Sequence, residues 1–366
     1  MPNVFAKILV FFLTFAPKKM KLHIFNPEHD LAMASGIANF TAPHAGRRLR
    51  ADLGYLPALW AGADDCVLVE NAAQARRAFG RLRARIGYSR FVEVHELGAL
   101  GVDAVEPWGW DAALRAFLLR HGVTSVPSES EIAAIRDLSH RRHAITLLKK
   151  LSVSLRAFSA LSLSEVEDRL DSIGHIVVKA PWSSSGRGVR FISGSVISDS
   201  DAGWIRNVIA KQGSIIVEPY YNKVKDFGME FESLGGGCVR YLGLSLFQTR
   251  GGAYMGNIVA TEEEKRAMLA RYVSPESLDA VARAACDCLG EIIGDRYCGP
   301  LGVDMMLVRG TNDTDPSVFL HPCVEINLRR TMGHVALAIP PAADGRMRSM
   351  QIELTDKYRL RLRSLH

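Results

Sequence analysis

The sequence predicts an α/β (α+β) protein made of two unlike parts, a small parallel-sheet domain and a larger region of antiparallel strands. Three observations support this. Short apolar strands alternate with helical patterns as far as about residue 130. Long strand patterns follow at 227–248, turned at the three glycines 235–237, and at 301–327. Finally, 366 residues suggest two or three domains at roughly 150 residues each.

The N-terminal part reads as alternating strands and helices. Strands are expected at 22–26, which Pro27 stops, and at 66–69. Helical patterns fit 45–53, 72–82 and 110–119. These elements favour a parallel sheet, because short strands that alternate with helices form βαβ units.

The first nineteen residues precede this pattern. Residues 8–16 are mostly apolar, but these nine are far fewer than the ~20 that a membrane span needs. No convincing cleavage site of small residues follows them. We therefore interpret residues 1–19 as an extension that is either disordered or upstream of the true start.

From residue 132 the pattern changes in kind. Apolar residues at helical spacing surround a basic patch at 139–143, within 132–151. The elements expected after it are, in order, strands at 175–180 and 189–192, a helix at 199–211, a strand at 214–219, strands at 227–233 and 238–248, helices at 263–271 and 275–294, and strands at 301–308 and 318–327. The predicted domains are 20–131, 132–217 and 218–366.

Composition and charge narrow the classes of function. The apolar fraction of 48% and charged fraction of 23% are ordinary for a folded chain and exclude a coiled coil or a collagen-like repeat. The net charge of +6 is scattered and not interleaved with aromatic residues on one evident face, which argues against nucleic acid. None of the six cysteines forms a CxxC pair, so free thiols in a reducing compartment are expected. With no stretch apolar enough to cross a bilayer, we expect a cytoplasmic protein.

The most informative stretch is a loop of small residues between two predicted strands, IVVKAPWSSSGRGVR at 176–190. Lys179 ends the first strand, where a compact cation can neutralise a phosphate. Small residues leave backbone N–H groups free to approach phosphate oxygens, and the serines at 183–185 can donate as well. A Walker loop, GxxxxGK[ST], is absent from the sequence. An ordinary flexible hairpin with a surface lysine is the alternative.

A second signal lies on two predicted strands far downstream. Asp304 interrupts an apolar strand, while Glu325 and Asn327 are two residues apart and so project from one face of theirs. If the strands pair, Asp304 joins that face. Two carboxylates and an amide oxygen are hard ligands suited to Mg²⁺, and a cation would relieve their mutual repulsion. The alternative is that each acid pairs with an arginine, for which Arg329 and Arg330 are at hand.

Together these signals resemble the ATP-grasp superfamily. The shared order is the lysine strand, the Ser/Gly loop, a returning strand and a helix, then VEPYY at 217–221 and D…ExN at 304–327. The loop VVKAPWSSSGRGVRFISG looks like the flexible loop of biotin carboxylase, and EINLRR like its metal-binding strand. The resemblance covers roughly 132–340. It implies an ATP-grasp fold, with residues 20–130 as the Rossmann-like βα domain that precedes the grasp.

The resemblance implies a role for each matching residue. The nucleotide-binding residues that it implies are Arg141, Lys179, Ser183, Ser184, Ser185, Gly186, Arg187, Gly188, Glu218, Pro219, Tyr220, Tyr221 and Asp226. Lys179 would contact the α- or β-phosphate, and the loop would close over the β- and γ-phosphates. The segment 218–221 would be the hinge strand whose backbone reads adenine, and Asp226 would bind the ribose. Arg141 stands where the family more often has lysine.

The implied metal site and chemistry follow from the same resemblance. Asp304, Glu325 and Asn327 would hold one or two Mg²⁺ (or Mn²⁺), and Arg329 would lie beside the γ-phosphate, so that Lys179 and Arg329 are the expected catalytic cations. In the family, a carboxylate attacks the γ-phosphate of MgATP, and an amine or other nucleophile captures the acyl phosphate. The expected partners are small molecules of these two kinds, without nucleic acid or membrane. A homodimer is compatible with the sequence.

Two loops are candidates for the organic substrate. The segment 26–30 follows the first strand, at the edge where open α/β sheets bind ligands. There we favour a substrate contact for His29 and an N-cap role for Asp30. Arg250, in a glycine-containing turn, could grip a substrate carboxylate bidentately or be a solvated arginine in a plain turn. Two alternatives to a ligase keep the same fold, a phosphotransferase and a nucleotide-binding protein without ligase turnover.

Overall fold

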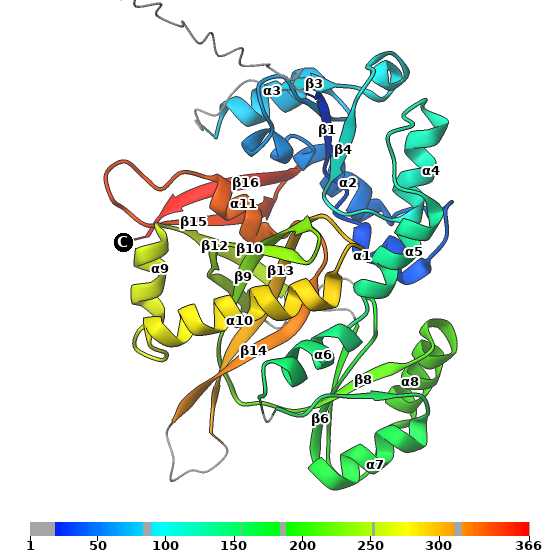
Figure 1. The fold of residues 1–366 in the computed structure, drawn as a ribbon, viewed down its shortest axis with the longest axis vertical. Coiled ribbons are helices and arrows are strands. Elements are labelled where there is room, and N and C mark those ends of the chain that lie inside the picture. Colours follow the sequence, from blue (N-terminus) through cyan, green and yellow to red (C-terminus); the bar gives the residue numbers. More distant parts are fainter. Residues whose placement is uncertain are drawn as a thin grey trace, which may run out of the picture.

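The computed structural model describes residues 19–82, 89–153, 155–183, 188–250, 253–310 and 317–365, apart from the side chains of Arg250 and Ala253. Nearly all of the predicted extension, 1–18, lies outside the described residues. The described part forms three stacked bodies, an N-terminal body at the top of Figure 1, a large-sheet body in the middle and a small-sheet body at the bottom. Four sheets of four strands each underlie them in this part of the chain.

The N-terminal body is the predicted parallel βα domain. Its sheet has the order β3-β2-β1-β4, and every pairing is parallel. The strands are β1 (Lys21–Ile24), β2 (Cys66–Leu68), β3 (Arg90–Val92) and β4 (Ala104–Pro107), and the helices are α1 (His29–Ser35), α2 (His44–Leu53), α3 (Ala72–Gly80) and α4 (Ala112–Arg120). Asp111 caps α4 by accepting the N–H of Leu114 at 2.9 Å, which fixes where that helix begins.

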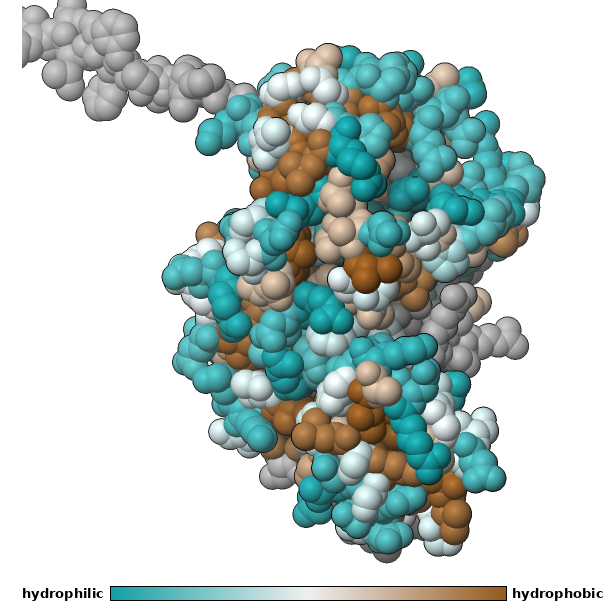
Figure 2. Space-filling view, turned by 90° about the vertical axis from the view of Figure 1, so that its right-hand side faces the viewer, coloured by the Kyte–Doolittle hydropathy of each residue, from teal (hydrophilic) through white to brown (hydrophobic). Residues whose placement is uncertain are grey.

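The small-sheet body carries the lysine strand. Its sheet has the order β5-β8-β6-β7, with helices packed on one face. The strands are β5 (Phe158–Ala160), β6 (His175–Lys179), β7 (Val189–Ser193) and β8 (Ile215–Pro219), and the helices are α7 (Leu163–Ile173) and α8 (Asp199–Gln212). Figure 2 shows hydrophobic surface on this lower body, whose most exposed apolar side chains include Leu161, Phe191 and Val196.

Two helices connect the N-terminal and small-sheet bodies. The pattern at 132–151 predicts one helical stretch, and the structure divides it into α5 (Glu129–Leu138) and α6 (Arg142–Lys150). The ring nitrogen Nδ1 of His140 accepts the N–H of Arg142 at 2.9 Å. The first amide of α6 is therefore bonded to a side chain and not to the preceding helical turn. This interrupts the helical hydrogen bonding, so α5 ends before this point and α6 begins at it.

The large-sheet body is antiparallel, in the order β10-β9-β13-β14. Its strands are β9 (Lys223–Gly235), β10 (Cys238–Ser245), β13 (Gly299–Arg309) and β14 (Val318–Asn327), and its helices are α9 (Glu262–Leu269) and α10 (Pro275–Ile293). Alternate residues of β9 and β13, such as Phe231 and Val303, are buried in one core with α6 and α10. The intervening residues therefore face away from these helices, and Asp304 is one of them.

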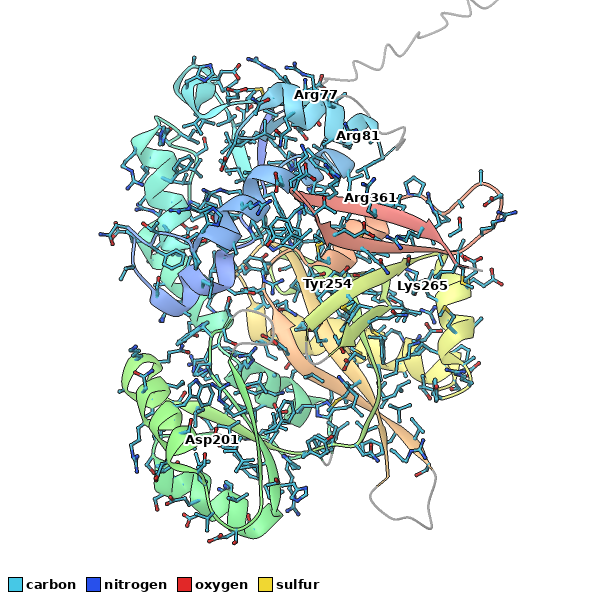
Figure 3. All side chains as sticks on the ribbon, turned by 180° about the vertical axis from the view of Figure 1, so that it is seen from behind. Arg77, Arg81, Asp201, Tyr254, Lys265 and Arg361 are labelled. Atoms are coloured by element: carbon cyan, nitrogen blue, oxygen red, sulfur yellow. The ribbon has the colours of Figure 1, made fainter. Side chains whose placement is uncertain are left out.

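A fourth sheet, which the sequence patterns did not predict, joins the large sheet to the N-terminal body. Its order is β11-β12-β15-β16, from β11 (Phe247–Arg250), β12 (Ala253–Val259), β15 (Arg348–Leu354) and β16 (Tyr358–Ser364), and α11 (Met332–Ala338) packs against it. Figure 3 shows Arg77 and Arg81 near Arg361 of β16, so two basic runs far apart in sequence lie at the same end of the molecule. All six cysteines are free, as expected. In the part of the chain that the structure describes, no helix has the length and apolarity of a membrane span.

Candidate functional site

The lysine strand presents a buried ion pair on the sheet face opposite α7 and α8. Val177 pairs with Glu218 and Lys179 with Ile216, so Lys179 and Glu218 share this face, which we call the lysine face. Lys179 Nζ lies 2.6 Å from Glu218 Oε2. Lys179 is only 8% exposed. The hairpin with a surface lysine is therefore excluded.

The predicted hinge segment leaves β8 at Pro219, and several of its polar groups already have partners. The N–H of Tyr220 donates to the carbonyl of His175 at 2.9 Å. The Tyr221 hydroxyl accepts the N–H of Arg156 at 3.2 Å, and burial raises its pKa. Backbone recognition of adenine by 218–221 stays a prediction, and the Tyr220 amide is not free for it.

The sequence patterns did not single out an exposed aromatic residue on the lysine face. Phe191 pairs with Val177 across β6 and β7 and is 70% exposed. Its ring meets that of Tyr220 edge to face, with centroids 6.1 Å apart. The alternation in VRFIS could have identified it, because Arg190 and Ile192 belong to the opposite face. A solvent-facing aromatic pair on this face could stack against a flat ligand.

The base of the small-residue loop is tightly closed. Ala180 donates its N–H to the carbonyl of Gly188 at 2.8 Å. A Cβ at Gly188 would lie 2.2 Å from Cβ of Ser183, so only glycine fits there. The remaining predicted loop residues, Ser184, Ser185, Gly186 and Arg187, lie outside the described residues, as does the side chain of Arg250.

The large sheet presents the predicted acids together, on a face that we call the acid face. Asp304 and Glu325 are direct cross-strand partners, and the Asn327 amide donates to Asp304 Oδ2 at 3.2 Å. The prediction that these three side chains share a face is confirmed. Asp226 and Glu230 of β9 join them through pairing with Met306 and Gly302. Burial, and then the charges of Glu325 and Glu230, raises the pKa of Asp304 to about 7.

The predicted ribose ligand, Asp226, is engaged by its neighbours. Its Oδ2 accepts the Thr249 hydroxyl at 2.7 Å and lies 2.5 Å from Lys223 Nζ. The carboxylate is therefore fixed at the edge of the acid face, where it could accept a further hydroxyl. Its role toward a ribose stays a prediction.

Arg141 connects the acid face with the loop. From the N-cap of α6, its Nη1 donates to the carbonyl of Ala180 and to Ser183 Oγ at 2.9 Å. Its Nη2 donates to Glu325 Oε1 at 2.7 Å. Arg141 is 8% exposed, so these contacts form in a setting where charge interactions are strong. Glu325 does pair with an arginine, but with Arg141 and not with Arg329 or Arg330.

Arg329 ties the acid face to the N-terminal body. It holds Asp30 bidentately, Nε to Oδ1 at 2.7 Å and Nη2 to Oδ2 at 2.8 Å, and Nη2 also donates to Asn327 Oδ1 at 3.0 Å. Although burial opposes its charge, Asp30 raises the pKa of Arg329. The predicted N-cap role of Asp30 is wrong. Helix α1 already begins at His29, and the Asp30 carboxylate turns toward Arg329 instead.

One small cavity brings the separated motifs together. It is lined by His29 and Asp30 of the N-terminal body, Ser183 of the loop, and residues 325–329 after the acid strand. His29 itself is buried, with Nδ1 3.4 Å from Asp111 Oδ2. Residues from all three bodies thus line this cavity. A contact between His29 and a substrate stays a prediction.

The donor set on the acid face fits a divalent cation in its chemistry. Asp304 and Glu325 offer carboxylates and Asn327 an amide oxygen, the hard ligands that Mg²⁺ takes. The amide oxygen accepts from Arg329 while the amide nitrogen faces Asp304, so this amide would have to turn over to join the carboxylates. Asp304 forms no ion pair with any described residue, so a cation there would balance its charge. No group of three or more His, Cys, Asp or Glu side chains is positioned for a metal among the described residues, so the amide would have to complete the set.

Comparison with known proteins identifies the fold. No family model matches the sequence, and no curated protein matches it. Biotin carboxylase from Campylobacter jejuni, solved as a β-γ-ATP complex, superposes with a TM-score of 0.52 at 12% identity, over 91% of this chain and 75% of that one. Phosphoribosylamine–glycine ligase from Thermotoga maritima gives 0.51 at 13% identity, over 91% and 80%.

A third solved structure also superposes on this chain. The biotin carboxylase domain of 2-oxoglutarate carboxylase from Hydrogenobacter thermophilus, a dimer with MgADP, ADP and bicarbonate, gives 0.50 at 14% identity, over 91% and 74%. The class is therefore an α/β protein in which a parallel βα domain precedes bodies built on antiparallel sheets. More particularly, this is the ATP-grasp fold that the motif order predicts.

Proposed function

We propose that the protein is an ATP-dependent, Mg²⁺-requiring ligase that activates a carboxylate as an acyl phosphate for attack by an amine or other nucleophile. One observation carries this proposal: Arg141 joins the base of the small-residue loop to Glu325, which supports a single site formed by the lysine face and the acid face. The solved structures with this fold include complexes described as holding β-γ-ATP or MgADP, which supports a nucleotide between the two faces.

The acid face would hold the metal. Asp304, Glu325 and Asn327 are its proposed ligands for Mg²⁺ (or Mn²⁺), which when bound supplies positive charge to the transferring phosphoryl group. Arg329 is fixed on two sides by Asp30 and Asn327, so its guanidinium is oriented before any ligand arrives. A fixed cation of this kind stabilises developing charge without reorganising during the reaction.

The lysine face would hold the nucleotide. Lys179 would donate a hydrogen bond to a phosphate oxygen beside Glu218, and Ser183 and Gly188 would carry the loop over the phosphates. Phe191 and Tyr220 offer an aromatic surface for the adenine ring, and Asp226 a carboxylate for the ribose. Positioning and electrostatics then do most of the work, because phosphoryl transfer needs no covalent protein intermediate.

The test separates the ligase from its alternatives. The protein is incubated with MgATP, pools of small carboxylic acids and hydroxylamine, and both ADP and acyl hydroxamate are measured. A ligase releases both together for at least one pool, because hydroxylamine captures the acyl phosphate. ADP without hydroxamate under every pool would favour a phosphotransferase that acts on another group. Failure to bind MgATP in calorimetry would refute the proposal.

A further inference from the structure

A second cavity, of about 270 Å³, lies inside the N-terminal body at the carboxyl ends of its parallel strands. The ends of β1 and β2 and the first turn of α4 line it. In the order β3-β2-β1-β4, β2 and β4 lie on opposite sides of β1, so the winding of the sheet reverses beside this cavity. Open α/β sheets bind ligands at such a switch point.

Some of the buried polar residues that line this cavity are satisfied by the protein itself. The Asn26 amide donates to the carbonyl of Gly109 at 2.8 Å and to Asp111 Oδ2 at 3.2 Å. Asp111 Oδ1 accepts the cap hydrogen bond from Leu114. These groups hold the strand ends together and leave little capacity for a ligand.

Glu28 is different. The side chain is 8% exposed, and Oε1 accepts a hydrogen bond from Arg50, whereas Oε2 is buried without a partner in the described structure. Burial raises the pKa of this carboxyl, which reflects how poorly it is solvated. A buried acceptor left without a hydrogen bond is costly, so it marks a place where a donor is missing. The missing donor fits an ammonium group.

The exposed lining of the cavity adds positive charge, and its carboxylate, Glu70, lies 3.8 Å from Arg50. Arg47 and Arg120 both line the cavity, both are exposed, and neither forms an ion pair with any described residue. Phe25, Phe40 and Phe117 add apolar wall to the same cavity. A buried acid, apolar walls and two free guanidiniums are complementary to a molecule that carries both an amine and an anionic group.

We propose that this cavity binds a small zwitterionic amine, an amino acid or an amino phosphate, with its ammonium on Glu28 and its anionic group on Arg47 and Arg120. Its volume is below the roughly 300–1,000 Å³ of pockets for drug-sized ligands, which favours a small metabolite. The site is separate from the cavity at Arg329 and goes beyond the proposed ligase function, since binding requires neither ATP nor turnover.

The test is binding by the full chain without nucleotide. Thermal shift and then calorimetry are run with the twenty common amino acids in one arm and O-phosphoethanolamine in the other, each beside its N-acetylated form. We expect saturable binding by at least one probe and a loss of about tenfold or more in affinity on N-acetylation, because the charge-assisted hydrogen bond is removed. Tighter binding of an amino acid would identify the anionic group as a carboxylate, and tighter binding of O-phosphoethanolamine would identify it as a phosphate.

Variants locate the site. Glu28→Gln should weaken that probe about tenfold or more. Because Glu28 also pairs with Arg50, the double variant Arg47→Ala/Arg120→Ala in the exposed lining provides a second test that leaves the core intact. Arg206→Ala, at an exposed position of α8 in the small-sheet body, is the matched control and should bind as the wild type does. No binding by any probe, equal binding of the N-acetylated form, or unchanged affinity in both Glu28→Gln and the double variant would overturn the proposal.

Discussion

The two faces that Arg141 connects differ in how their charges are balanced. On the lysine face, Lys179 and Glu218 are 2.6 Å apart and neutralise each other in a buried pair. On the acid face, Asp304 has no ion pair among the described residues and faces Glu325 directly across the strands. The lysine face is electrostatically complete without a ligand, whereas the acid face has negative charge to spare. Removing charge should therefore impair stability on the lysine face and activity on the acid face.

The largest effect is expected on the acid face. Glu325→Gln, or Asn327→Ala, should lower the rate of ATP consumption by about 10³-fold, because each removes a proposed metal ligand from a preorganised site. The free energy of unfolding should fall by only about 1 kcal/mol in Glu325→Gln, because the amide oxygen can still accept the hydrogen bond from buried Arg141. Asn327→Ala removes the hydrogen bonds to Asp304 and from Arg329 and should cost a similar amount. A coupled assay for ADP and urea denaturation measure the two quantities.

A matched substitution controls for the loss of a glutamate. Glu232→Gln lies on β9 of the same sheet, where its carboxylate pairs with exposed Arg240, and should leave ATP consumption unchanged. Near-normal turnover in Glu325→Gln and Asn327→Ala would remove both residues from the proposed metal site.

On the lysine face, the first effect should be on folding. Lys179→Met leaves Glu218 buried without its partner and should lower the free energy of unfolding by about 3 kcal/mol. The double variant Lys179→Met/Glu218→Gln removes both charges and should recover most of that loss. ATP affinity, measured by calorimetry, should stay weak in both variants. Wild-type ATP affinity in the stable double variant would show that Lys179 serves the fold alone.

The loop base offers a smaller and purely steric comparison. Gly188→Ala puts a Cβ against Ser183 and should cost about 2 kcal/mol through overpacking, in stability or in ATP affinity as the loop shifts. Gly203→Ala, within α8 and with nothing within 4 Å of the added Cβ, should instead stabilise by about 0.5–1 kcal/mol through helix propensity. Equal responses of the two variants in thermal unfolding and ATP binding would contradict a tightly fitted loop base.

Local patterns predicted much of this architecture. Alternation placed Glu325 and Asn327 on one face, and the apolar strand around Asp304 was long enough to suggest its pairing with them. The βα alternation likewise predicted the parallel sheet. These predictions succeed because burial of one face of a strand or helix repeats apolar residues at a short, regular spacing along the sequence. The motif order then predicted the fold, since each motif had to occur at a fixed place along the chain.

The contacts that assemble the site could not be predicted in the same way. Arg141 and Glu325 are 184 residues apart, and Asp30 and Arg329 are 299 apart. No local period relates such pairs. Asp30 follows a strand and precedes an apolar helical pattern, so its sequence context favoured an N-cap role. In the structure its carboxylate instead forms the ion pair with Arg329 of the large-sheet body. The sheet of β11, β12, β15 and β16 was missed for a similar reason, because its strands come from two segments about ninety residues apart.

The smallest expected effect concerns the turn between the two faces. His140, next to Arg141, is buried, its Nε2 lies 3.2 Å from Ser214 Oγ, and Nδ1 accepts the N–H of Arg142. Burial, and then the charges of Arg142 and His143, lowers its pKa to about 4, while Asp137 opposes the shift. The unfolded chain binds this proton near pH 6.5, so the contribution is present above that pH and is lost as the pH falls toward 4.

The pH dependence should therefore locate this turn. Between pH 7 and pH 5 the wild type should lose about 1–2 kcal/mol of unfolding free energy through His140. His140→Asn, whose side-chain oxygen can replace Nδ1 as acceptor, should be less pH-dependent by that amount in urea denaturation. His95→Asn, at an exposed position, should follow the wild type. Identical pH dependence in wild type and His140→Asn would contradict this prediction. It would mean that protonating His140 costs no stability, and that the turn beside Arg141 can adjust to the added charge.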